Sequence, residues 1–208
     1  MTDNARVASR KRLLAAAGIV GPSFFIADWA VLGTRAKNYS PVHDAISELA
    51  HMHAPTRPAM TAGFLVFGVA LPTYAVALRD ALPGRAWQFA AANGVATLGV
   101  AAFALGTPTS GKIHGAFAAL AYASLAAVPI SASLALRDRR PSWRARASMA
   151  TGVACGAALI ASVVGPTQVH GLLQRVGLTI GDLWLITSAA AMLQSTDPDP
   201  GAHPGPAE

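Results

Sequence analysis

The sequence predicts an all-α polytopic membrane protein, a bundle of six transmembrane helices with both termini in the cytoplasm. Composition is the first reason. Hydrophobic residues are 53% of the 208 residues, charged residues are 12%, and the mean hydropathy is +0.42, whereas soluble domains carry about 25% charged residues. The second reason is that the apolar residues gather into segments close to the length of about 20 residues that crosses a bilayer. The third reason is a bias in where the positive charges fall.

The apolar segments define one membrane domain over 13–194. They are rich in Ala, Leu and Gly and lack the alternation of a membrane strand, which favours helices. The six segments are 13–33, 58–78, 87–106, 114–136, 147–165 and 172–194. A basic cytoplasmic arm, 1–12, precedes them. An acidic Pro/Gly-rich tail, 195–208, follows them, and its composition predicts disorder.

Polar stretches separate the segments in chain order. The first segment starts at Leu13 and outruns the apolar core of a cleaved signal peptide, so we expect it to remain as a span. Arg79 and Arg85 lie between the second and third segments, and the polar run 106–114 lies between the third and fourth. An arginine-rich run, 137–146, separates the fourth from the fifth, and a Gly-Pro pair ends the fifth.

The net charge of the chain is +6, and most of the lysine and arginine residues lie on one side of the expected membrane. Five of the 16 basic residues lie on the other side: Arg35, Lys37, Arg57, Lys112 and Arg175. The remaining residues flank the N-terminal segment or occupy the second and fourth connections, and the positive-inside rule places that side in the cytoplasm. The sequence therefore predicts a multi-pass plasma-membrane protein with membrane lipids as partners and no nucleic acid.

A nucleotide is not expected either. Gly106–Ile113 resembles a phosphate-binding loop, but Ile113 stands where a Ser or Thr would bind Mg²⁺, and the run follows a membrane helix rather than a strand.

The first connection is expected to form a short amphipathic helix on the outer membrane surface. Ser40-Pro41 is a helix-start signal. Asp44, Glu48 and His51 then share one helical face. Such a helix either keeps its polar face in water or presents it to a site.

Five of the six histidines fall in the three connections on the exoplasmic side: His43, His51, His53, His114 and His170. The last two each follow a Pro-Thr pair and precede a glycine. One explanation of such a His-Gly pair is structural: the histidine lies at the water interface, and the glycine permits close packing. Alternatively, the connections converge on one exoplasmic vestibule. Its lining would be Ser47, Glu48, His51, His53, His114, His170 and Arg175.

A zinc site is one use for converging imidazoles. His51, His114 and His170 could hold zinc with an open position for water, although no compact zinc-binding signature is present. The imidazoles could instead act as acid and base, or bind a lipid phosphate when protonated. Cys155 is the single cysteine, so a disulfide within the chain is impossible.

Two carboxylates fall inside apolar segments, Asp28 near the outer end of the first and Asp182 near the middle of the sixth. Such groups need a partner or a water-filled cavity. Arg175 lies about two turns from Asp182 on the same face and is a candidate partner. A structural ion pair, a protonated acid, and a proton or cation path all remain open.

Two small-residue motifs predict close helix contacts. They are Gly152 with Gly156 in the fifth segment and Gly177 with Gly181 in the sixth. The contacts can form within the chain or along a homo-oligomer seam.

The run Tyr39-Ser-Pro-Val-His-Asp-Ala-Ile-Ser-Glu-Leu49 resembles a known family, as do Gly63-Phe-x-x-x-Gly68, the His114-Gly115 pair and Leu173-Gln-Arg175 with Trp184. The chain is similar to bacterial six-span membrane proteins of domain-of-unknown-function family 998 over about residues 13–194. In that family an aspartate often follows the third span, where this chain has Ser110. The resemblance implies the six-span fold and no established activity. A more distant similarity, to the Frag1/DRAM/Sfk1 group, implies a connection with membrane lipids.

Three functions are therefore open. The vestibule could bind a lipid headgroup or small amphiphile. The same groups could serve a membrane-embedded, possibly zinc-dependent hydrolase or transferase. Asp28 and Asp182 could relay protons or cations in a small transporter or exporter.

Overall fold

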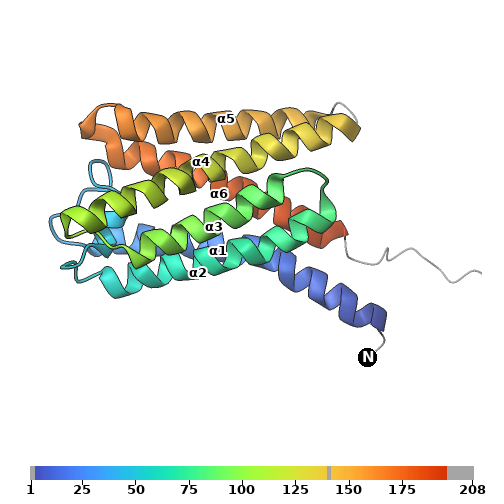
Figure 1. Cartoon of the computed structure of the whole chain (residues 1–208), viewed down its shortest axis with the longest axis horizontal. Coiled ribbons are helices and arrows are strands. Elements are labelled where there is room, and N and C mark those ends of the chain that lie inside the picture. Colours follow the sequence, from blue (N-terminus) through green and yellow to red (C-terminus); the bar gives the residue numbers. More distant parts are fainter. Residues whose placement is uncertain (1–2, 140–141, 196–208) are drawn as a thin grey trace, which may run out of the picture.

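Six α-helices joined by short connections make up the computed structural model, which describes residues 3–139 and 142–195 (Figure 1). The helices are α1 (Asp3–Arg35), α2 (Arg57–Ala81), α3 (Ala86–Ala102), α4 (Pro108–Arg139), α5 (Trp143–Val164) and α6 (His170–Ser195). Two short 3₁₀ helices, η1 (Ile46–Ala50) and η2 (Thr167–Val169), lie in connections. The described residues contain no strand, which confirms the all-α prediction. Residues 196–208 of the predicted tail lie outside them.

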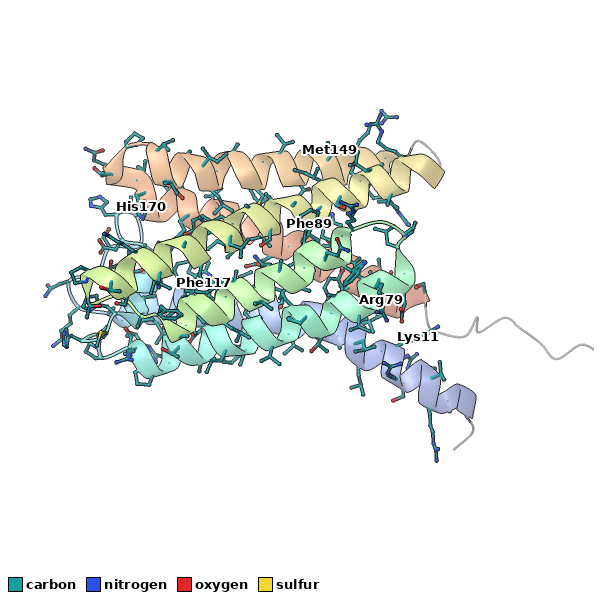
Figure 2. All side chains as sticks on the ribbon, viewed as in Figure 1. Lys11, Arg79, Phe89, Phe117, Met149 and His170 are labelled. Carbon is teal, nitrogen blue, oxygen red and sulfur yellow. The ribbon has the colours of Figure 1, made fainter. Side chains whose placement is uncertain are left out.

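The six helices form a closed ring in chain order. Each helix packs against the next, and α6 packs against α1. The alternating direction gathers the connections at two ends (Figure 1). The histidine end holds 36–56, 103–107 and 165–169, and the terminus end holds the start of α1 and the connection 82–85. Figure 2 shows His170 at the first end and Lys11 at the second.

Within the described residues, five helices are long and apolar enough to cross a membrane: α1, α2, α4, α5 and α6. The chain therefore has the features of a multi-pass membrane protein. α3 is shorter, because its 17 residues extend about 25 Å at 1.5 Å per residue. Residues 3–12 of the expected basic arm continue α1 as helix.

The predicted third segment extends too far, because α3 ends at Ala102 and not at 106. Phe103 leaves the helical conformation, and Gly106 has a φ of +140°, which few residues other than glycine adopt. The Leu105 carbonyl accepts the Met52 N–H at 2.9 Å. This bond ties the α3–α4 connection to the first connection.

The four glycines of the small-residue motifs pack inside the chain. A Cβ at Gly152 would lie 2.5 Å from Ile130 of α4, and one at Gly156 would lie 3.4 Å from Ala126. Similarly, a Cβ on each glycine of the α6 motif would approach a leucine of α5 or α4 to 2.6 Å. Each glycine therefore permits a close helix contact within the chain.

Candidate functional site

Loop 36–56 closes the histidine end of the ring by packing into it. Ile46 and Leu49 are each 1% exposed, and η1 is the loop's helical part. The loop therefore forms a buried cap over the bundle.

The predicted surface helix starting at Ser40 is wrong. The chain turns between Ser40 and Asp44, where the Ser40 carbonyl accepts the Asp44 N–H at 2.7 Å. The Asp44 carboxylate accepts the Ser40 N–H in return, also at 2.7 Å. A side chain that pairs with a nearby backbone group in this way competes with helix formation.

Two neighbouring side chains of α6 hold the loop in this shape. Gln174 Oε1 accepts the Ile46 N–H at 2.8 Å. Arg175 Nη1 donates to the carbonyls of Pro41 and Asp44 at 2.7 and 2.9 Å. An α-helix would satisfy these backbone groups internally; here α6 satisfies them, so the loop is stable without continuing as a helix.

Arg175 is 6% exposed, and polar groups and aromatic rings surround its charge. The guanidinium carbon lies 5.5 Å from the ring centroids of both Trp29 and Tyr39, and Nη2 donates to the Tyr39 hydroxyl. A desolvated cation–π contact is worth about 2 kcal/mol. The described residues show no ion pair between Arg175 and Asp182, the partner that helical spacing suggested.

Tyr39 links this cluster to η1. Burial raises the pKa of the Tyr39 phenol above its ordinary value, and the nearby Arg175 guanidinium opposes part of the rise. A neutral phenol can donate to the Ala45 carbonyl, 3.1 Å away, while accepting from Arg175.

Two of the sequence runs that carry the family resemblance are therefore in contact. The run 39–49 forms the loop, and Gln174 and Arg175 of the Leu-Gln-Arg run hold it. Gly63 of the third run makes room for a carboxylate, because a Cβ there would collide with Asp28.

A wide cavity of about 960 Å³, called the vestibule below, opens at the histidine end. The end of α1, the loop and the start of α6 form its walls. Its basic and imidazole side chains outnumber its carboxylates. The former are Arg35, Lys37, His43, His51, His53 and His170, and the latter are Asp44 and Glu48.

This balance makes the vestibule favourable to anions. Arg35 and Lys37 carry positive charge at neutral pH. Asp44 already accepts a backbone N–H, which leaves Glu48 as the carboxylate without a hydrogen bond among the described residues.

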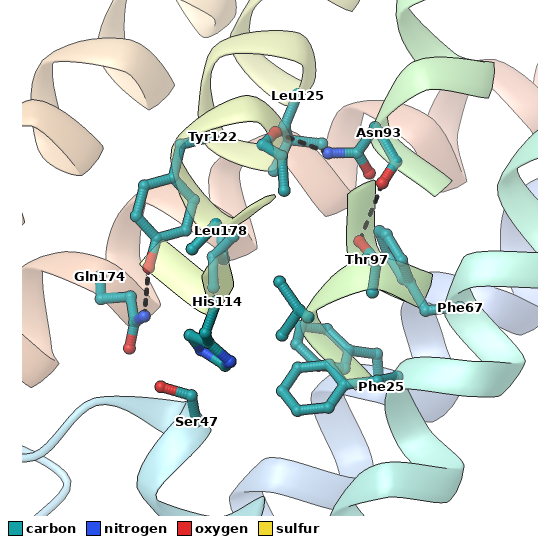
Figure 3. Close-up of a pocket in the computed structure, with 14 residues that line it drawn as sticks. Phe25, Ser47, Phe67, Asn93, Thr97, His114, Tyr122, Leu125, Gln174 and Leu178 are labelled. Carbon is teal, nitrogen blue, oxygen red and sulfur yellow. Dashed lines mark hydrogen bonds between the residues drawn. The ribbon is translucent and has the colours of Figure 1, made fainter. Parts of the chain in front are cut away.

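A second, smaller cavity of about 60 Å³ lies beneath η1 and inside the ring. Figure 3 shows Ser47 and His114 towards one end of it and Asn93 with Thr97 towards the other. Tyr122 accepts a hydrogen bond from Gln174 there, and Asn93 Oδ1 is buried with no hydrogen-bond partner among the described residues. The volume suits a few water molecules.

His114 and His170 share one structural role. His114 Nδ1 donates to the carbonyl of Phe103, which follows α3, at 2.9 Å. His170 Nδ1 pairs with the carbonyl of Ser162 in the last turn of α5. A carbonyl only accepts, so Nδ1 carries the hydrogen in both rings, and each imidazole caps the helix that precedes its own.

The glycines after these histidines differ. A Cβ at Gly171 would collide with the Asp44 carbonyl and lie 2.9 Å from Arg175 Nη1. A Cβ at Gly115 would meet nothing within 4 Å. The close-packing explanation is therefore correct for Gly171 and wrong for Gly115.

The seven residues expected to share one site are divided. Ser47 and His114 line the inner cavity, and Arg175 is buried under the loop. Glu48, His51, His53 and His170 line the vestibule. In the described part of the chain, no group of three or more His, Cys, Asp or Glu side chains is placed to hold a metal ion, so His51, His114 and His170 do not form the three-imidazole arrangement that zinc would use.

Both acids inside the helices have buried oxygen atoms without hydrogen-bond partners in the described structure. Asp182 is fully buried and both its carboxylate oxygens are unpaired, and Asp28 has one such oxygen. The ion-pair alternative therefore finds no partner for either acid among the described side chains.

Sequence reasoning missed several residues of the two cavities. Arg35 and Lys37 contribute to the sequence prediction only as topology signals, although their position directly after an apolar segment is a clue to a place in the vestibule. Gln174 stands beside Arg175 in a run already singled out. Asn93 and Tyr122 gave no signal beyond being polar groups within apolar segments.

The chain belongs to the family described as protein of unknown function DUF998, whose model matches residues 19–191. No curated protein and no solved structure matches the chain.

Proposed function

We propose that this member of the DUF998 family is a six-span plasma-membrane protein whose exoplasmic vestibule binds the anionic headgroup of a lipid or small amphiphile. Both termini are cytoplasmic in this proposal. The bias of lysine and arginine towards the terminus end supports that orientation.

α3 is the sixth span in this proposal. Its 17 residues fall a little short of the roughly 30 Å hydrocarbon core, and a short span is accommodated by local thinning of the bilayer. Packing of α3 between α2 and α4 in the ring supports this assignment.

The observation that carries the binding proposal is the lining of the vestibule. Two permanent cations and four imidazoles face a cavity of about 960 Å³ at the end of a membrane bundle. Arg35 is the last residue of α1, so this proposal puts its guanidinium at the level of the lipid headgroups. A phosphate group can accept two parallel hydrogen bonds from an arginine guanidinium.

Binding of glycerophosphoglycerol tests the proposal. This molecule is an anionic phosphodiester headgroup without acyl chains, and calorimetric titration in detergent measures its affinity. The Arg35→Gln/Lys37→Gln double variant is expected to weaken binding roughly tenfold, since each exposed ion pair contributes up to about 1 kcal/mol.

Lys112→Gln is the matched control, because Lys112 is an exposed cation near the same end outside the vestibule lining. Equal loss in the control and the double variant would attribute binding to general charge. Glycerophosphocholine, which has no net charge, is expected to bind weakly to all three proteins.

Proton-coupled transport is a second candidate, favoured by the unpaired carboxylate of Asp182 at 0% exposure. Asp182→Asn is expected to abolish proton flux into liposomes containing the protein and to leave headgroup binding unchanged. Unchanged flux in this variant would remove the candidate. The zinc-dependent hydrolase alternative is not carried forward, because His51 and His170 line the vestibule whereas His114 lines the inner cavity.

A further inference from the structure

An apolar groove of about 660 Å³, called the arginine groove below, lies near the terminus end, outside the vestibule and the inner cavity. It runs between the start of α3 and the second half of α4. Its walls include Pro83, Gly84, Phe89, Ile130 and Leu134, with Arg85 among the lining residues. Figure 2 labels Phe89 between α3 and α4.

Its length fits part of an extended chain. From Ala127 to Ala135 the α4 wall extends over eight residue steps, or about 12 Å of helix. Leu134 is 51% exposed although it is apolar. In a bilayer this wall would meet hydrocarbon, so an acyl chain would bury it.

Arg85 gives the groove a charged end. The residue is exposed, precedes the first residue of α3, and has no side-chain partner among the described residues. No side chain caps α3, and the N–H groups of Ala86 and Trp87 have no acceptor in the described structure. The partial positive charge of a helix start adds to that of Arg85.

We infer that the arginine groove binds an anionic phospholipid, with one acyl chain against Phe89 and Leu134 and the phosphate at Arg85. Charge complementarity supports this occupant. The terminus end carries most of the basic residues, and each lysine or arginine near an anionic surface contributes about 1 kcal/mol.

Native mass spectrometry tests the inference on the full chain, released from nanodiscs that contain equal amounts of phosphatidylglycerol and phosphatidylcholine. Wild type is expected to retain phosphatidylglycerol in preference. Arg85→Gln is expected to lower the preference about fivefold, which is the effect of one such charge. Arg144→Gln is the matched control, since Arg144 is exposed near the same end and lies over Trp143, outside the groove.

A second variant tests the acyl chain. Leu134→Gln leaves Arg85 in place and makes the wall polar at an exposed position, so folding is retained while lipid retention falls. The Arg35→Gln/Lys37→Gln variant is expected to keep the preference, which separates this groove from the vestibule.

Three outcomes of the lipid measurements would overturn the inference. They are no lipid preference in wild type, equal losses in Arg85→Gln and Arg144→Gln, and full retention in Leu134→Gln. A dimer in place of bound lipid would also overturn it and would indicate a second copy as the occupant.

Discussion

Gln174 and Arg175 show how two side chains can shape a distant loop. Both are more than 90% buried and reach backbone groups about 130 residues away in sequence. A buried backbone group without a partner costs about 1–3 kcal/mol. The pair therefore stabilises the loop, and the loop in turn forms a wall of the vestibule.

Removing the Gln174 carboxamide is expected to loosen this loop. Gln174→Leu leaves the Ile46 N–H without an acceptor, and we expect a loss of about 1–3 kcal/mol in the free energy of unfolding. Denaturation in mixed micelles measures the loss, and hydrogen exchange at Ile46 localises it. Thr187→Val is the control, since Thr187 bonds within α6 and should change stability by no more than about 0.5 kcal/mol. Equal losses would contradict this role.

Tyr39 gives the loop a pH dependence at alkaline pH. Because burial raises its pKa, the folded protein holds the phenolic proton more tightly than the unfolded chain does. The stabilisation is complete below about pH 10, the ordinary tyrosine range, and is lost as the pH rises through the folded-state pKa.

Unfolding measured at rising pH tests this effect. Wild type is expected to lose stability more steeply above about pH 10 than Tyr39→Phe, which has no phenolic proton at this position. The difference between the two proteins isolates Tyr39 from the other tyrosines. Parallel curves would contradict the assignment.

At the scale of elements, the two His-Gly pairs share the role of the histidine and differ in the surroundings of the glycine. Each histidine caps the preceding helix, which explains why the pair recurs at the starts of α4 and α6. Only the second glycine lies against the loop.

Alanine substitution at the two glycines is expected to give opposite results. Gly171→Ala places a Cβ against the Asp44 carbonyl and should cost about 1–3 kcal/mol or more. Gly115→Ala meets open space and should be neutral or stabilising by up to about 1 kcal/mol, because alanine is the better helix former. Thermal unfolding of the pair measures both, and similar effects at the two sites would contradict the packing described.

Local sequence predicted the helices well, because a membrane requires each apolar segment to satisfy its own backbone. It failed at the end of α3, where 103–106 are apolar and hydropathy does not distinguish a turn from a helix. It failed again at Ser40–Asp44, because Arg175 satisfies carbonyls from a distance. The vestibule was predicted in part: four of its residues were expected, whereas the place of Arg35 and Lys37 depends on how α1 meets the loop.

At the scale of the whole molecule, the ring places unlike chemistry at its two ends. The histidine end has an open vestibule with a cationic lining, and the terminus end has an apolar groove with one arginine. Loop 36–56 covers the centre of the ring, so the vestibule and the inner cavity lie on opposite sides of η1.

The most direct test of the central claim is the affinity for glycerophosphoglycerol of wild type and of the Arg35→Gln/Lys37→Gln variant, measured beside the Lys112→Gln control. Wild type is predicted to bind this headgroup, with the affinity lowered roughly tenfold in Arg35→Gln/Lys37→Gln and unchanged in Lys112→Gln. Affinity that is absent in wild type, or equal in wild type and the double variant, would contradict an anion-binding vestibule.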